Sequence, residues 1–326
     1  MPVIDVHAHL TPQRFKDAVH ATGTWHGLGP ETGELQWPGF TRSLDERLAE
    51  MDAMGVDVQV LSPNDGFYQY DKSVDLTTTV ARECNDEIAE VVERHPSRFV
   101  GLGTLPMQDV DAAIAELQRA VDVLGLRGAM IDDHVNGRTY DDPAFMPFFR
   151  AAERLGALLF FHQCGPTTVR ARINRYSLPN AIGNLTDRTV TFASLVHGGV
   201  LDACPDLKLL LAHAGGYTAF GAGRLDKAAG GFEGGYPDGE WDHDLRISRP
   251  PSTYLTQFFY DCCTYDGAAL RFLIDRVGVE RVMLGSDYPA PMFLKDPVHW
   301  VLGLDELTAD EKRAIVSDNA AALLGP

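Results

Sequence analysis

The chain has 326 residues, of which 45% are hydrophobic and 23% are charged, a mixture typical of globular proteins and unlike disordered or fibrous ones. Its formal net charge of −18 disfavours nucleic acid and anionic membranes, because both carry charge of the same sign. We therefore expect neither of them among its partners.

Short apolar runs alternate with helical patterns along the chain, an arrangement typical of parallel βα units. Predicted strands lie at residues 3–6, 56–61, 99–105, 127–131, 157–161, 207–212, 258–261 and 281–285. Predicted helices lie at residues 44–54, 76–93, 110–124, 143–155, 189–201 and 308–324. Eight strands, most of them followed by a helix, predict a single α/β domain over residues 1–326, a distorted (β/α)8 TIM barrel.

The competing fold is a doubly wound open sheet. It is disfavoured because the first turn holds His-Ala-His, and not the glycine-rich G-x-G-x-x-G that binds a dinucleotide. Three irregular excursions interrupt the alternation, at about residues 12–45, 164–188 and 230–256. We expect them to lie over the C-terminal mouth of the barrel.

The cysteines and the first residues bear on the compartment. The five cysteines are odd in number and contain no C-x-x-C pair, which indicates free thiols in a reducing cytoplasm. The beginning of the sequence lacks the basic residues and the apolar run of a secretory signal. No run reaches the roughly 18 apolar residues that a membrane helix needs. We expect a cytoplasmic protein.

Five ionisable residues stand at the ends of predicted strands: His7, His9, His162, His213 and Asp287. In a barrel all these positions open onto the C-terminal face, where active sites lie. His7 and His9 share one face of a strand, with Cα atoms roughly 6.6 Å apart, so both imidazoles can reach one cation. His162 and Asp287 can complete the ligand set. Three imidazoles and a carboxylate suit Zn²⁺, with Mn²⁺, Fe²⁺ and Co²⁺ as alternatives.

Each of these residues alone has an ordinary structural interpretation. A single histidine after a strand is usually structural, and Asp287 could belong to a turn within Gly285-Ser286-Asp287-Tyr288-Pro289. The coincidence of metal-type ligands at four strand ends favours a functional site.

The motifs at these strand ends resemble the amidohydrolase superfamily. They are Ile4-Asp5-Val6-His7-Ala8-His9, Phe161-His162, Leu211-Ala212-His213-Ala214-Gly215-Gly216 and Met283-Leu284-Gly285-Ser286-Asp287-Tyr288-Pro289. More narrowly, the chain resembles the branch that contains aminocarboxymuconate-semialdehyde decarboxylase and the γ-resorcylate-type decarboxylases. Residues 50–60 and 249–254 also match that branch, and the resemblance runs from about residue 3 to 324.

The resemblance implies one divalent metal, usually zinc, with His7, His9, His162 and Asp287 as ligands and His213 as a nearby acid or base. It implies no carboxylated lysine, and the fourth predicted strand offers none. It also implies a homodimer in which Arg224 binds a substrate carboxylate across the interface. The muconate enzyme uses a further arginine in its early excursion, whereas residues 21–41 of this chain contain no arginine. Arg170 is a second candidate for binding a substrate carboxylate.

The predicted activity is non-oxidative decarboxylation of a planar unsaturated or aromatic carboxylic acid, with His213 or Asp287 supplying a proton. No organic cofactor is expected, since no phosphate-binding glycine loop and no lysine at a strand end occur. The alternative is a hydrolase of an amide, ester, lactone or activated C–C bond that uses metal-activated water. A non-catalytic metal-binding barrel is the alternative from a different class.

Overall fold

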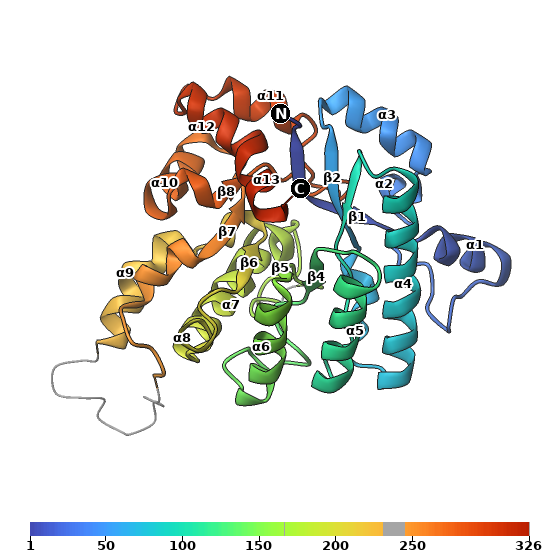
Figure 1. The fold of residues 1–326 in the computed structure, drawn as a ribbon, viewed down its shortest axis with the longest axis horizontal. Helices are drawn as coiled ribbons and strands as arrows, with labels where there is room; N and C mark the ends of the chain where they lie inside the picture. Colours follow the sequence, from blue (N-terminus) through green and yellow to red (C-terminus); the bar gives the residue numbers. More distant parts are fainter. Residues whose placement is uncertain (166, 231–244, 326) are drawn as a thin grey trace.

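The centre of the molecule is a ring of parallel strands surrounded by helices (Figure 1). The computed structural model describes residues 1–165, 167–230 and 245–325. In these residues the strands are β1 (Ile4–Leu10), β2 (Val58–Pro63), β3 (Phe99–Gly101), β4 (Gly128–Ile131), β5 (Leu158–Phe161), β6 (Lys208–Leu211), β7 (Phe258–Asp261) and β8 (Val282–Met283).

The strands pair in two parallel arcs, β1-β2-β3 and β4-β5-β6-β7-β8. Isolated bridges join the arcs at both seams, Ala8 with Tyr288 and Gly103 with Ala129. The strand order is that of the predicted barrel. The barrel is distorted, since each seam is closed by an isolated bridge and a few backbone hydrogen bonds in place of a continuous ladder.

The α-helices cover the outside of the ring. In the described residues they are α1 (Gln13–Thr22), α2 (Pro38–Thr41), α3 (Leu44–Met54), α4 (Val74–Arg94), α5 (Val110–Asp122), α6 (Met146–Leu155), α7 (Leu185–His197), α8 (Val200–Ala203), α9 (Thr218–Ala229), α10 (Gly267–Val277), α11 (Pro297–Gly303), α12 (Ala309–Arg313) and α13 (Asn319–Leu324). Short side chains cap several of them; Ser43 and Glu46, for example, form a capping box that begins α3.

Shorter helical turns complete the secondary structure. The 3-10 turns are η1 (Asp65–Phe67), η2 (Pro143–Phe145), η4 (His213–Gly215), η5 (Pro251–Gln257) and η6 (Val279–Arg281). Two π-helical turns are η3 (Pro179–Asn184) and η7 (Ala314–Asp318). Such turns often occur at functional sites, and η3 leads directly into α7.

The excursions are partly more regular than the sequence predicts. The first, residues 12–45, contains α1 and α2 and the start of α3. The second ends in η3 and the start of α7, so the helix predicted at 189–201 begins earlier, at Leu185. The helix predicted at 308–324 is divided by η7 into α12 and α13. In the third excursion, residues 231–244 lie outside the described residues.

The core lies inside the ring and between the ring and the helices. All four residues of β4 and of β5 are buried, and α5 turns Ala113, Leu117 and Ala120 inward. Burying a large aliphatic or aromatic side chain stabilises the fold by about 1.5–3 kcal/mol. This packing fixes the strand ends, and therefore the polar groups that they carry.

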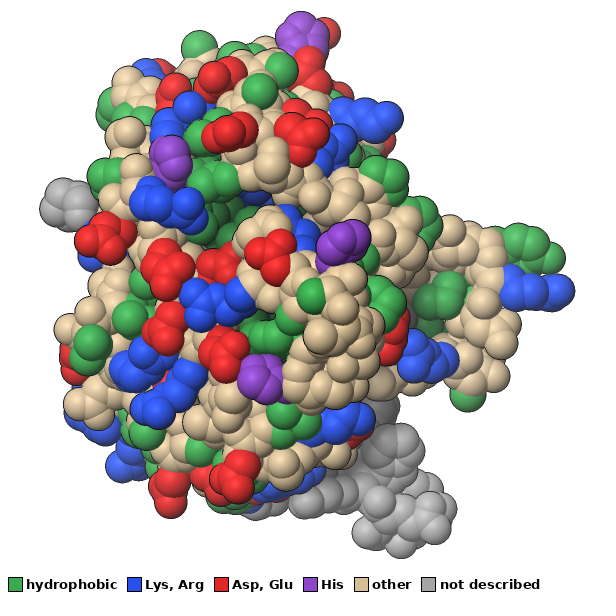
Figure 2. Space-filling model, turned by 90° about the vertical axis from the view of Figure 1, so that its right-hand side faces the viewer, with side chains coloured by type: hydrophobic (Ala, Val, Ile, Leu, Met, Phe, Trp, Pro, Cys, Tyr) green, Lys and Arg blue, Asp and Glu red, His purple; other side chains and the backbone are tan. Residues whose placement is uncertain are grey.

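The surface mixes charges of both signs. Figure 2 shows acidic and basic side chains interspersed over one face, beside small hollows lined by apolar side chains. No helix among the described residues has the length and apolar character required to cross a membrane.

Candidate metal centre and active site

Four side chains from the ends of three strands converge on one buried point. His7 and His9 lie on β1, His162 follows β5, and Asp287 follows β8. The Nε2 atoms of His7 and His9 are 3.1 Å apart, and Asp287 Oδ1 lies 3.2 Å from each of them. His162 Nε2 lies 3.9 Å from the same oxygen. All four side chains are buried, and their ligand atoms lie within 4.8 Å of one another.

The two histidines of β1 are held by their other ring nitrogens. His7 Nδ1 lies 2.7 Å from Asp261 Oδ2, and His9 Nδ1 lies 3.2 Å from Ser62 Oγ. Both Nε2 atoms therefore face the shared point. Metal-binding histidines are commonly held in this way by a carboxylate or hydroxyl on the second nitrogen. The donor set thus fits one divalent ion.

The buried charges determine which of these side chains are protonated. Burial lowers the pKa of His7, but the charge of Asp287 and the hydrogen bond to Asp261 outweigh it and raise this pKa to about 10. Burial lowers the pKa of His9 to about 4. Burial raises the pKa of Asp287, but the His7 charge and hydrogen bonds from the histidines hold it well below its usual value. Near neutral pH, His7 is therefore the protonated histidine of this pair, beside the carboxylates of Asp261 and Asp287.

His213 stands beside this cluster on a tight turn after β6. Its Nε2 lies 3.6 Å from Asp287 Oδ2, and its Nδ1 has no hydrogen-bond partner among the described residues. The backbone N–H groups of His213 and Ala214 each donate to Asp261, at 2.8 Å. Asp261 therefore fixes both His7 and the turn that carries His213.

The backbone of this turn is unusual. His213, Ala214, Gly215 and Gly216 have φ values of 54°, 56°, 71° and 64°. Left-handed backbone in non-glycine residues costs free energy and is often found at functional sites. Asp287 also has a positive φ, 63°, and its N–H donates to the His7 carbonyl oxygen at 2.9 Å. His213 and Asp287, which face each other across the site, are therefore both held by strained backbone.

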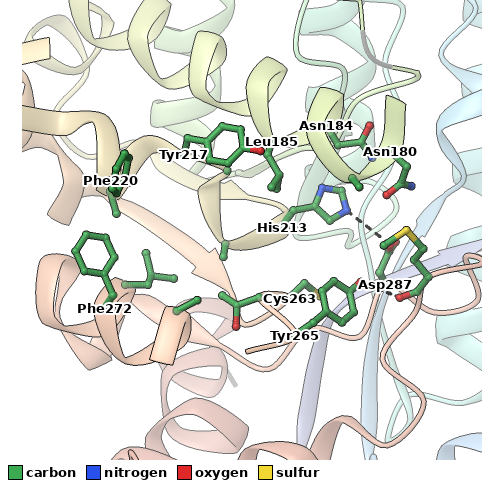
Figure 3. Close-up of a pocket in the computed structure, with 18 residues that line it drawn as sticks. Asn180, Asn184, Leu185, His213, Tyr217, Phe220, Cys263, Tyr265, Phe272 and Asp287 are labelled. Carbon is green, nitrogen blue, oxygen red and sulfur yellow. Dashed lines mark hydrogen bonds and ion pairs between the residues drawn. The ribbon is translucent and has the colours of Figure 1, made fainter. Parts of the chain in front are cut away.

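Two cavities meet at His213 and Asp287. The wide cavity, of about 500 Å³, extends from these residues between α9 and α10 to the surface (Figure 3). Its outer part is lined by aromatic side chains, among them Tyr217, Phe220 and Phe272. The narrow cavity, of about 250 Å³, touches His9 and His162 and is lined by polar groups from the first and second excursions. Asn180 and Asn184 of η3 line both cavities.

The two arginines proposed to bind substrate lie outside both cavities. Arg170 is exposed, and its guanidinium lies over Gly165, which lines the narrow cavity. Arg224 is exposed on α9 and belongs to the lining of neither cavity. Neither arginine touches the four-residue cluster among the described contacts.

Several residues of the site were not anticipated from the sequence. Asn64 and Asp65 follow β2 and line the narrow cavity, so the rule of polar residues at strand ends could have identified them. Asp261 at the end of β7 could have been identified in the same way. Glu34 also lines the narrow cavity, but it lies in an irregular part of the first excursion with φ 54°, and no periodic pattern marks it.

Comparison with known proteins gives a consistent result. Residues 4–325 match the model of the amidohydrolase family. The chain is 32% identical, over 99% of its length and 91% of the relative, to a 2-amino-3-carboxymuconate-6-semialdehyde decarboxylase of Dictyostelium discoideum.

Solved structures are similar over nearly the whole fold. A 5-carboxyvanillate decarboxylase of Sphingomonas paucimobilis has a TM-score of 0.84 and 29% identity, covering 99% of this chain and 98% of that one. A dihydroxybenzoic acid decarboxylase of Polaromonas sp. JS666, solved with manganese and the inhibitor 2-nitroresorcinol, has a TM-score of 0.82 over 99% of this chain and 96% of that one. At 23% sequence identity, this structural likeness shows that the two chains share a fold.

Proposed function

This chain belongs to the amidohydrolase family, and from that premise we propose that it is a metal-dependent, non-oxidative decarboxylase of an aromatic or planar unsaturated carboxylic acid. The observation that carries the proposal is its likeness, over the whole chain, to a named decarboxylase. The buried cluster with His213 beside it supplies the groups that this reaction needs.

His7, His9, His162 and Asp287 would hold one divalent metal ion. Bound there, the ion would supply Lewis-acid stabilisation of the negative charge on substrate oxygens. The resident metal we propose is Zn²⁺, which three imidazoles and a carboxylate suit; Mn²⁺, the ion in a structural neighbour, is the alternative. Metal analysis of protein purified without chelator distinguishes the two.

His213 and Asp287 would move the proton. We place the substrate where the two cavities meet, so that the carbon bearing the carboxylate faces His213 Nε2 and Asp287 Oδ2. A proton from this pair is added to that carbon, the C–C bond breaks, and CO₂ leaves. The product carries hydrogen where the carboxylate was, and no oxidant or reductant is needed. General acid catalysis of this kind typically contributes about 10²–10⁴-fold.

Two arginines are proposed to offset the acidic field of the chain. Arg170, over Gly165, would attract an anionic substrate to the mouth of the narrow cavity. Arg224 would act from a partner chain in a homodimer, at the outer end of the wide cavity. In support, Phe220 on α9 is 83% exposed and Phe272 on α10 is 42% exposed, which is the apolar character expected of an interface.

The five cysteines, free in the structure, support a reducing cytoplasm.

The reaction is tested by running it in D₂O with metal-loaded protein and hydroxybenzoates or muconate semialdehydes as substrates. We expect CO₂ release and one deuterium on the carbon that lost the carboxylate. Protein stripped with a chelator should be inactive and should recover with Zn²⁺ or Mn²⁺. Turnover of these acids without CO₂ release, or equal activity without metal, would refute the proposal.

A further inference from the structure

One wall of the narrow cavity presents carboxyl and amide groups whose oxygens can accept hydrogen bonds. Glu34 comes from the first excursion, and Asn64 and Asp65 follow β2; we call these three residues the acceptor wall. The same cavity is bounded by His9, His162 and Asp287, so the wall faces the space beside the metal centre.

The orientation of Asn64 follows from its neighbours. Asn64 is 1% exposed, and its Nδ2 donates to Thr11 Oγ1 at 3.0 Å. The Thr11 hydroxyl gives its own hydrogen to the Gly33 carbonyl oxygen at 2.9 Å, so toward Asn64 it can only accept. The amide nitrogen of Asn64 must therefore face Thr11. Its Oδ1 is left buried, without a hydrogen-bond partner among the described residues.

A buried hydrogen-bond acceptor without a partner destabilises the folded protein. Asn184, 5% exposed on η3 at the same cavity, also has an Oδ1 without a described partner. Buried polar atoms in native proteins nearly always find a partner. These oxygens therefore point to a ligand that brings hydrogen-bond donors into the cavity.

Burial at this wall also disfavours negative charge. Burial raises the pKa of Glu34 to about 7, and the charge of Asp287 adds to the effect. Burial also raises the pKa of Asp65 well above its usual value, and the nearby charge of Glu34 raises it further. No lysine or arginine is among the described residues that line either cavity. The raised pKa values mean that this wall disfavours negative charge. A carboxylate of the substrate placed against it would meet the same burial without a compensating cation.

We propose that the acceptor wall is the specificity-determining surface of the enzyme, and that its substrate bears a hydroxyl or amino group that donates to Glu34, Asn64 or Asp65. A second carboxylate at that position is excluded. This inference rests on the proposed decarboxylase function for the placement of the scissile carboxylate at the metal. The inference narrows the substrate class to acids that carry a hydroxyl or amino group, and no second carboxylate, at the position facing the acceptor wall.

The test compares matched pairs of aromatic acids on metal-loaded protein. Gentisate and 4-hydroxyisophthalate differ by a hydroxyl replaced with a carboxylate, and so do β-resorcylate and 2-hydroxyterephthalate. We expect the dihydroxy member to be preferred by about 10²-fold in kcat/KM, because sites built to accept from a hydroxyl reject analogues that lack it. Equal or greater activity on the dicarboxylates would overturn the proposal.

Variants of Glu34 and Asp65 test whether the preference for dihydroxy acids arises at the acceptor wall. Glu34→Gln replaces an ionisable carboxyl with an amide whose N–H groups can donate to a carboxylate, so it should reduce the preference at least about tenfold. Asp65→Asn should reduce it in the same direction. Glu31→Gln, an exposed residue of the same excursion that lines neither cavity, should leave it unchanged. A preference unchanged in Glu34→Gln and Asp65→Asn would overturn the assignment.

Binding separates this inference from the proposed reaction. Calorimetry with the same acids measures dissociation constants for metal-loaded protein whether or not CO₂ is released. If no CO₂ appears but the dihydroxy acids still bind more tightly, and Glu34→Gln removes the difference, the decarboxylase proposal fails and the acceptor wall stands. Equal binding of both members of each pair would refute the acceptor wall directly.

Discussion

At the scale of single residues, His213 and Asp287 carry the proposed chemistry. His213 faces Asp287 at 3.6 Å but lies outside the group of four ligand atoms. We therefore predict that His213→Asn retains most of the bound metal and loses activity by about 10²-fold or more, the scale of general acid catalysis. Metal analysis and kcat measured on the same preparation check this. Parallel loss of metal and activity would show instead that His213 is a ligand.

Metal binding should release a proton from His7. In the metal-free protein the pKa of His7 is raised to about 10, whereas that of His9 is lowered to about 4, so near pH 8 only His7 of this pair must lose a proton to become a ligand. The apparent affinity for metal should therefore rise about tenfold per pH unit and level off above about pH 10. Calorimetry at pH 8 in two buffers of different ionisation enthalpy measures the proton count. A count of zero would contradict this assignment.

The residues that the sequence could predict are those on regular elements. His7, His9, His162, His213 and Asp287 stand at strand ends, and a barrel brings such positions to one face. Glu34 could not be predicted, because its place depends on the path of an irregular segment held by contacts such as Thr11 with Gly33. The ligand and acid roles of the five strand-end residues remain predictions for the experiments above.

At the scale of elements, the turn between β6 and α9 positions His213. A methyl group on Gly216 would overlap the carbonyl oxygen of Leu185, and its φ of 64° is unfavourable for other residues. Gly216→Ala should therefore destabilise the fold by more than about 1 kcal/mol and lower kcat with it.

The matched control lies five residues further along. Gly221 on α9 has open space where a methyl group would be added, so Gly221→Ala should leave kcat unchanged and slightly raise the melting temperature. Thermal unfolding and kcat of both variants provide the comparison. Similar behaviour of the two variants would show that the close packing of Gly216 does not position His213.

Element prediction succeeded where the apolar pattern was periodic and capped. The helix predicted at 44–54 has the bounds of α3, because Ser43 and Gly55 supply the cap residues at its two ends. α1 was missed because most of its side chains are polar and only Phe15 is buried. The interruption of the last helix by η7 changes only local hydrogen bonding and leaves no mark in the hydrophobic pattern.

At the scale of the whole molecule, assembly must overcome a net charge of −18 per chain. We predict a homodimer that buries the exposed aromatic side chains of α9 and α10, with an interface of about 1,600 Å² or more. Phe220→Lys should shift the protein toward monomer in sedimentation experiments and lower activity. Val123→Lys, at an exposed position that directly follows α5, should change neither. A fully active wild-type monomer at micromolar concentration would rule out both the dimer and the shared site.

The central claim, decarboxylation and not hydrolysis by the same buried cluster, is tested most directly in H₂¹⁸O. Metal-loaded protein is incubated with the acids above, and both CO₂ release and the ¹⁸O content of the other product are measured. The account predicts one CO₂ per turnover and no ¹⁸O in the product ring or chain. An ¹⁸O-labelled acid or alcohol formed without CO₂ would identify a hydrolase and contradict the account.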